Sequence, residues 1–342
     1  MPGSSVKIYI NRIMKNYNIR DLFALLSFIM VLSIMTGCSG SAEKNKAESD
    51  YRGVEIGAIT YSWRSMPCTP EDIILYCEQA GISTLELMGD VAEIYAGAPE
   101  GPVYPENYTE LSTEERAEFQ KHLEEHAVRM TQWRIRGTSA DKYRELKNLF
   151  DEAGIQIHAV KFSPADWSDE EIDYAFESAS ILGARAVTNE IGVDAARRLG
   201  PFAEKHGMYA VFHNHGQPGD TAFHFEDFLA FSPNNMLNLD VGHYFGATGM
   251  NPSELITKLH DRIYSIHMKD KTGPLGYPPD TNARWGMGDT PLADILSLIK
   301  VNQWDIYCDV ELEYDIPEGS NAVIETAKCV KYARDILASV GG

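Results

Sequence analysis

Short apolar segments alternate with amphipathic helical patterns along most of this chain, and no other feature of the sequence restricts its fold as strongly. Each segment has the length of a buried strand, and the residues after it place apolar side chains at helical spacing. Strands and helices that alternate in this way form a parallel sheet, and eight such units close into one (β/α)8 barrel. The expected strands cover residues 54–60, 84–88, 155–162, 186–190, 208–213, 236–240, 263–268 and 306–311.

The boundaries of several helices between these strands can also be predicted. Thr69, Ser168 and Asn251 each stand before an acidic first turn, as N-cap residues do. Glycines follow several of the helices just before the next strand, where a left-handed residue often ends a helix. The pattern predicts one α/β domain over residues 53–342, although the length alone would also fit two domains.

The second strand-helix unit is longer than the others. Residues 89–138 contain a segment rich in Gly and Pro and then a predicted helix from Ser112 to about Met130, before the regular helix begins near Ser139. We therefore expect a long insertion after the second strand. An insertion at this end of a barrel strand often acts as a lid over the site, and an insertion used for packing or for contact between subunits is the alternative.

The first residues have the features of an export signal. Basic side chains precede an uncharged apolar run over residues 22–35, which is too short to cross a bilayer as a helix. The next residues, Thr-Gly-Cys, resemble the end of a bacterial lipobox, where the chain is cut before the cysteine and lipid is attached to its sulfur. We therefore expect a signal peptide over residues 1–37, lipidation at Cys38 and a flexible tether over residues 38–52.

This prediction makes the protein an exported lipoprotein, anchored by lipid in the cell envelope, at the periplasm or the outer membrane. A buried N-terminal helix that ends at a chance Gly-Cys pair is the alternative. The formal charge of the chain is -20, so the folded body repels nucleic acid and anionic lipid, and we expect membrane contact only through the lipid anchor.

The remaining cysteines leave two interpretations open. In an oxidising compartment they allow three disulfide pairings, and as free thiols they serve as small buried apolar side chains. None forms a CxxC pair, which argues against a cysteine zinc site. These residues are Cys68, Cys77, Cys308 and Cys329.

Polar side chains stand at the carboxyl ends of five consecutive predicted strands, the end at which barrels carry their sites. Period-two alternation turns them toward one mouth. They are Glu190, His213, Asp240 with His243, His267 with Lys269, and Glu311 with Glu313. Several carboxylates cannot be buried together without a counter-charge, which a divalent cation supplies. Mixed carboxylate and imidazole ligands suit Mn, Co or Zn, and an oxygen-rich site suits Mg.

The same strand ends carry a recognisable series of motifs. In chain order these are Phe-His-Asn-His-Gly at 212–216, Leu-Asp-Val-Gly-His at 239–243, Ile-His-Met-Lys-Asp at 266–270, Gly-Met-Gly-Asp at 286–289 and Val-Glu at 310–311. Together they resemble the sugar phosphate isomerase/epimerase group of xylose-isomerase-like barrels, over residues 54–338. The resemblance implies a TIM barrel that binds one divalent metal ion through a Glu, an Asp, a His and a second Glu. At the matching positions these are Glu190, Asp240, His267 and Glu311.

The chemistry implied by the resemblance is proton abstraction next to a sugar carbonyl, through an enediolate that the metal stabilises. Glu190 and Glu311 would then act as the catalytic acid and base on opposite faces of the substrate. The resemblance also implies contacts between the substrate and four further residues, namely His213 and His243 through hydrogen bonds and Lys161 and Lys269 through stabilisation of negative charge.

Three details of this assignment remain open in the sequence. A one-residue slip in the fourth strand would turn Asn189 inward in place of Glu190. Glu313 shares a face with Glu311 and is an alternative ligand. Lys161 serves either the substrate or a salt bridge with a carboxylate at the mouth.

The expected partner is a small carbohydrate. An exported protein has little access to sugar phosphates, and the chain has no Gly-rich phosphate loop, so we expect an unphosphorylated sugar, keto-sugar or glycoside. A lyase or hydratase that acts on 3-keto-glycosides through the same metal is the first alternative. A sugar-binding lipoprotein without activity is the second alternative. A DNA-repair enzyme with the same barrel is a third, and the acidic charge of the chain argues against it. The sequence leaves the metal and the oligomeric state open and is compatible with a homo-oligomer.

Overall fold

A computed structural model describes residues 53–105, 107–137 and 140–340 of the chain. The predicted signal peptide, the lipidation site Cys38 and the tether lie outside these described residues, so those three predictions remain predictions. In the part of the chain that the structure describes, no helix is long and apolar enough to cross a membrane.

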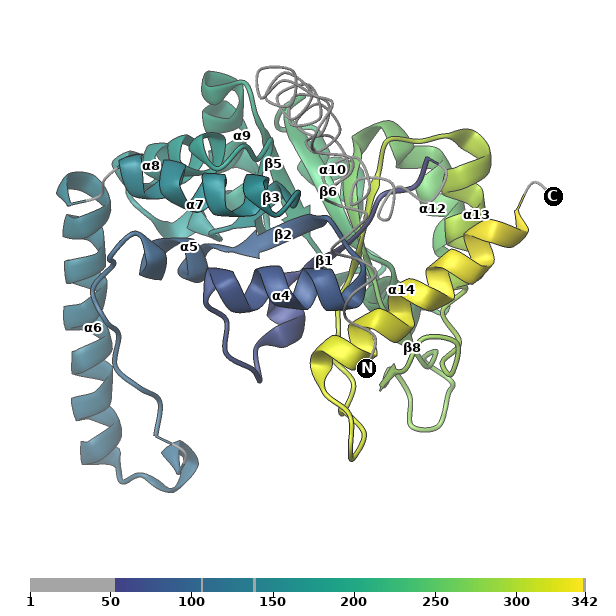
Figure 1. The fold of residues 1–342 in the computed structure, drawn as a ribbon, viewed down its shortest axis with the longest axis horizontal. Coiled ribbons are helices and arrows are strands. Elements are labelled where there is room, and N and C mark those ends of the chain that lie inside the picture. Colours follow the sequence, from purple (N-terminus) through teal and green to yellow (C-terminus); the bar gives the residue numbers. More distant parts are fainter. Residues whose placement is uncertain (1–52, 106, 138–139, 341–342) are drawn as a thin grey trace, which may run out of the picture. The chain divides into compact units, whose positions relative to one another are not determined.

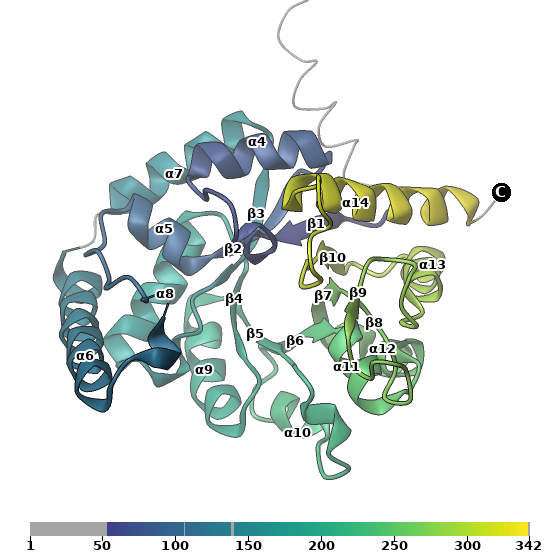
Figure 2. The same cartoon turned by 90° about the horizontal axis from the view of Figure 1, so that it is seen from below.

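Eight parallel strands form a closed barrel, in the order β1-β10-β7-β6-β5-β4-β3-β2 (Figure 2). Each strand lies at or close to a range predicted from the sequence, and the predicted (β/α)8 barrel is confirmed. The strands are β1 Ile56–Ile59, β2 Thr84–Met88, β3 Gln156–Lys161, β4 Ala186–Glu190, β5 Tyr209–His213, β6 Asn235–Asp240, β7 Ile263–Met268 and β10 Tyr307–Val310.

Helices connect the strands and surround the barrel (Figures 1 and 2). At α4 and α8 the predicted caps are complete capping boxes: the side chains of Thr69 and Ser168 accept the backbone N–H of Asp72 and Glu171, whose carboxylates bond back. The helices are α4 Pro70–Ala80, α5 Gly89–Tyr95, α6 Thr113–Arg136, α7 Ala140–Glu152, α8 Asp169–Ile181, α9 Val193–His206, α10 Phe225–Leu229, α11 Val241–Thr248, α12 Pro252–Leu259, α13 Leu292–Asn302 and α14 Ala322–Ser339.

Buried side chains fill the inside of the barrel. His158 on β3 lies 3.2 Å from Asp309 on β10, two strands that are not neighbours, so the contact crosses the interior. Tyr307 stacks on the His158 ring at 4.0 Å, and Gly57 on β1 has no room for a side chain because a Cβ there would lie 2.4 Å from the Asp309 carboxylate. The barrel is therefore a packed core, as expected for this fold.

The long segment between β2 and β3 contains α5, α6 and α7. Its helix α6 packs against α8 at the edge of the barrel, and Figure 2 shows it outside the ring of strands. Arg134 fixes the base of α6, with its guanidinium 2.7 Å from Glu93, 3.1 Å from Glu171 and 3.5 Å from the centre of the Trp167 ring. This placement supports the packing alternative for the segment more than the lid.

The cysteines of the described residues are all free thiols. Cys77, Cys308 and Cys329 are buried and Cys68 is half-buried, so the structure agrees with small apolar side chains rather than with disulfides.

Candidate metal centre

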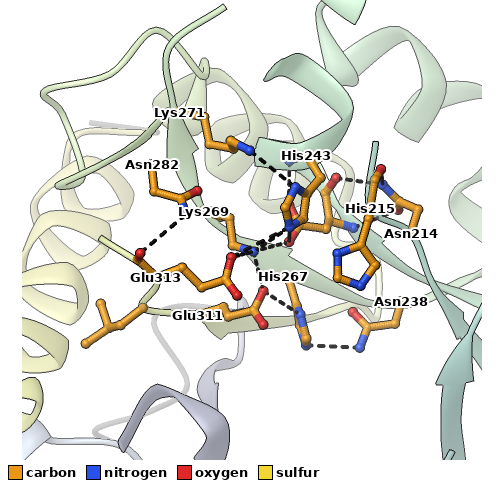
Figure 3. A network of polar contacts seen from close by, with 12 residues as sticks. Asn214, His215, Asn238, His243, His267, Lys269, Lys271, Asn282, Glu311 and Glu313 are labelled. Atoms are coloured by element: carbon orange, nitrogen blue, oxygen red, sulfur yellow. Dashed lines mark hydrogen bonds and ion pairs between the residues drawn. The ribbon is translucent and has the colours of Figure 1, made fainter. Parts of the chain in front are cut away.

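Four side chains that can bind a metal converge at the carboxyl ends of neighbouring strands. His213 ends β5, Asp240 ends β6, His267 lies on β7 and Glu311 directly follows β10. One ligand atom from each lies within 4.8 Å of those of the other three, and all four residues are buried. Figure 3 shows that His267 and Glu311 point toward one another, with Lys269 between Glu311 and His243. We refer to His213, Asp240, His267 and Glu311 as the mouth cluster.

The donor atoms of the mouth cluster fit a divalent cation. His213 is 1% exposed, its Nδ1 has no hydrogen-bond partner among the described residues, and burial lowers the pKa of its ring well below the ordinary value. A neutral imidazole with a free nitrogen is a metal ligand. Asp240 accepts the His243 N–H at 2.7 Å through Oδ1, which leaves Oδ2 directed to the cluster. Two imidazoles and two carboxylates suit Mn, Co or Zn.

His267 stands between two carboxylates. Its Nδ1 lies 3.1 Å from Oε2 of Glu311, and its Nε2 lies 2.6 Å from Oε2 of Glu86. Burial alone would lower the pKa of the His267 ring, but Glu311 and Glu86 raise it to about 10. The ring is therefore held in one orientation by charges on both sides.

The Lys269 ammonium neutralises the acidic side of the site. Its Nζ lies 2.9 Å from Oδ2 of Asp240 and 2.8 Å from Oε2 of both Glu311 and Glu313. The side chain is 2% exposed, and although burial opposes its charge, these carboxylates raise its pKa above the ordinary value. His243 completes the group, with Nε2 3.0 Å from Lys269 Nζ.

Glu190 belongs to a second group at the rim. Its carboxylate lies 2.7 Å from Lys161 Nζ and 2.9 Å from His215 Nε2, and its side chain is 43% exposed. Burial opposes ionisation, but His215 and Lys161 lower the pKa of Glu190 to about 2. Glu190, His213 and His215 form a second set of close donor atoms, so His213 is common to the two groups.

The structure thus brings together three of the four expected ligands, Asp240, His267 and Glu311. Glu190 does not share the mouth cluster, and His213, which the sequence analysis assigned to substrate binding, lies there instead. Lys161 forms the salt bridge that was the alternative to a role in substrate binding.

The two other open details also have an answer in the geometry. The Asn189 side chain accepts the N–H of Ala165 at 3.0 Å and donates to the carbonyl of Glu190, so it is committed to the backbone around β4. Glu313 contacts Lys269 but is not part of the mouth cluster, which contains Glu311.

Three residues of this region were not predicted from the sequence as site residues, namely Glu86, His215 and Lys271. Glu86 is completely buried on β2, and the signal for it was a single acidic residue inside the apolar strand Thr-Leu-Glu-Leu-Met. His215 lies within the motif at 212–216, which predicted no role for it. Lys271 follows the motif at 266–270, and its Nζ lies 3.3 Å from Nδ1 of His243.

Comparison with known proteins agrees with the barrel fold. The family model of the xylose isomerase-like TIM barrel matches residues 74–333, which is most of the chain. The chain belongs to this family. No curated protein matches this xylose isomerase-like barrel.

Solved structures with the same fold come from several bacteria. A sugar phosphate isomerase/epimerase from Parabacteroides distasonis has a TM-score of 0.53 at 18% identity, covering 82% of this chain and 94% of its own. A probable 3-DHS dehydratase of petrobactin synthesis from Bacillus anthracis has a TM-score of 0.53 at 14% identity, covering 83% and 98%. A xylose isomerase domain protein from Alicyclobacillus acidocaldarius has a TM-score of 0.55 at 13% identity, covering 83% and 98%. At these identities the likeness establishes the fold alone.

Proposed function

We propose that this xylose isomerase-like barrel is a divalent-metal-dependent isomerase or epimerase of an unphosphorylated sugar or keto-sugar. The observation that carries the proposal is the mouth cluster, in which two imidazoles and two carboxylates are buried within reach of one ion. His213, Asp240, His267 and Glu311 would hold that ion. Once bound, the ion would polarise a sugar carbonyl and so favour loss of the proton beside it.

Glu311 is the first candidate for the base. Burial opposes its ionisation, but Lys269 and His267 lower the pKa of Glu311 well below the ordinary value, so the carboxylate is ionised and able to accept a proton. Lys269 would stabilise negative charge that develops on the substrate oxygens, because its ammonium is already buried at this position.

Glu190 is the candidate for the second proton transfer, together with its partners. The His215 ring and the Lys161 ammonium both contact its carboxylate, and Glu190 raises the pKa of His215. This group therefore contains an ionised acceptor beside the Lys161 ammonium and a histidine whose pKa is raised, which is what return of a proton to a sugar carbon or oxygen requires. His243 would contact substrate oxygens from the other side of Lys269.

The charge balance of the mouth supports an unphosphorylated substrate. Lys161 is paired with Glu190, Lys269 with three carboxylates, and Lys271 with Asp280 at 2.6 Å. A phosphate group would have to compete with these carboxylates for every one of the three ammonium groups. A neutral sugar needs only hydrogen bonds.

A lyase acting on 3-keto-glycosides is the second candidate. The observation that favours it is the place of Glu190, which is paired with His215 and Lys161 and lies outside the mouth cluster. One base, Glu311, and a separate cationic group that protonates a departing oxygen are sufficient for elimination. The probable dehydratase from Bacillus anthracis has the same fold.

Solvent deuterium incorporation tests both candidates. The metal-loaded protein would be incubated in D2O with a panel of free sugars and 3-keto-glycosides, and the products analysed by mass spectrometry and NMR. Deuterium in a sugar of altered configuration supports the isomerase or epimerase, and release of the aglycone with an unsaturated keto-sugar supports the lyase. Absence of exchange with every sugar, in a protein that retains its metal, would contradict the proposed function. Glu311→Gln is the control for exchange that does not depend on the site.

A further inference from the structure

We propose that Glu86 is the residue that positions His267 for metal binding, by accepting the Nε2–H of the ring and thereby reserving Nδ1 for the ion. The inference rests on the proposed function, because it concerns the same metal centre.

Glu86 reaches His267 across the interior of the barrel. It lies on β2, whereas His267 lies on β7, and β1 and β10 separate these strands in the sheet. Oε2 of Glu86 is 2.6 Å from Nε2 of His267, and both side chains are completely buried. A bond this short between a ring N–H and a carboxylate is of the charge-assisted type.

The chemistry of the two groups fixes the position of one proton. An ionised carboxylate only accepts hydrogen bonds, so Nε2 of His267 must carry a hydrogen in this contact. Nδ1 is the nitrogen that faces the mouth cluster, 3.1 Å from Glu311, so an ion that binds there displaces the hydrogen directed at Glu311, while the hydrogen on Nε2 stays with Glu86. Metal-binding histidines commonly donate their second N–H to a carboxylate, which fixes the tautomer and the ring plane and makes the other nitrogen a better ligand.

Asn238 holds Glu86 in place. Its Nδ2 donates to the same Oε2 at 2.9 Å and lies 3.0 Å from Nε2 of His267, so two N–H groups converge on one carboxylate oxygen. Asn238 is on β6, two residues before Asp240. These contacts therefore connect β2 to β7, which carries His267, and to β6, which carries Asp240.

Packing alone does not explain an acidic residue at this position. The neighbours of Glu86 on β2, Leu85 and Leu87, are buried apolar residues, and a leucine would also suit a strand surrounded by core. A buried carboxylate is unfavourable unless a cationic partner compensates it. For Glu86 the direct partner is His267, whose other nitrogen points to the mouth cluster.

The test compares metal affinity in the full-length chain and in three variants. Co2+ binding would be followed by its visible spectrum, and Zn2+ affinity would be measured by competition with a chelator. We expect Glu86→Leu to weaken affinity by roughly 10- to 100-fold, as loss of such an outer partner does elsewhere. Glu86→Gln, which keeps the volume and one acceptor oxygen, should recover part of the loss and shift the Co2+ spectrum less.

Asp309→Asn is the matched control. Asp309 is also a buried carboxylate beside a buried histidine, 3.2 Å from His158, but it lies outside the mouth cluster. We expect this variant to lose stability yet keep wild-type metal affinity. The proposal is overturned if both Glu86 variants bind Co2+ and Zn2+ as tightly as the wild type, or if Asp309→Asn loses as much affinity as they do. A wild-type chain that binds neither ion would instead overturn the proposed function, and this inference with it.

Discussion

Removal of the Lys269 ammonium should destabilise the metal-free protein and make it depend on metal. In Lys269→Met the carboxylates of Asp240, Glu311 and Glu313 lose a cation that lies within 2.9 Å of each of them. The ammonium is 2% exposed and the carboxylates of Asp240 and Glu311 are at most 5% exposed, so water cannot replace it. Breaking a buried ion pair in this way costs about 3–5 kcal/mol of unfolding free energy.

At about 2–4 °C per kcal/mol for a large domain, the loss of unfolding free energy in metal-free Lys269→Met corresponds to a fall of roughly 6–20 °C in Tm. The same three carboxylates explain why metal should reverse part of this fall. An ion at 100 times its Kd restores about 2.7 kcal/mol. The wild type should gain less from the same metal concentration, because the ion has to compete with the ammonium of Lys269 for Asp240 and Glu311.

Calorimetry of the two proteins with and without Zn2+ measures both effects. Lys271→Met is the matched control, because the Lys271 ammonium is also buried but pairs with Asp280 and with no residue of the mouth cluster, so its removal should leave the gain in melting temperature from Zn2+ at the wild-type value. The reasoning is refuted if metal-free Lys269→Met melts at the wild-type temperature, or if Zn2+ raises both melting temperatures equally.

Three further predictions concern the rim, the insertion and the N-terminus. The pKa of Glu190, about 2 against an ordinary 4.5, gives stability that is present above about pH 4.5 and is lost as the pH falls toward 2. The unfolding free energy of Glu190→Gln, measured by urea denaturation, should therefore change less between pH 4.5 and pH 2 than that of the wild type. The difference should be modest because the Glu190 side chain is 43% exposed. Arg134→Met should lower the unfolding free energy by about 3 kcal/mol, because it leaves the buried carboxylates of Glu93 and Glu171 without their cation, while Zn2+ affinity stays at the wild-type value. Cys38→Ala should abolish incorporation of labelled palmitate and release the protein from the membrane fraction, and unchanged labelling would contradict the lipoprotein proposal.

The barrel could be predicted because its signal is local. Each strand is an apolar run with a turn or cap beside it, and the pattern repeats in chain order. The inward face of β4 was also predictable from period-two alternation, which turns Glu190 to the mouth and leaves Asn189 for the backbone.

The membership of the mouth cluster could not be predicted, because it depends on the stagger between strands. His213 is in register with Glu190 on one side and with Asn238, rather than Asp240, on the other. That offset follows from the tilt of the strands in the closed barrel, so the sequence of a single strand does not show it. Glu86 was missed for a related reason, since its partner His267 is 181 positions away and contacts it only across the interior.

The most direct test of the metal centre is a crystal structure of the chain loaded with Zn2+ or Co2+, with anomalous scattering used to locate the ion. We expect one ion bound by His213, Asp240, His267 and Glu311, with Lys269 displaced from Asp240 and Glu311. An ion bound by Glu190 and His215 without the mouth cluster, or a loaded protein whose ion lies elsewhere, would contradict this expectation.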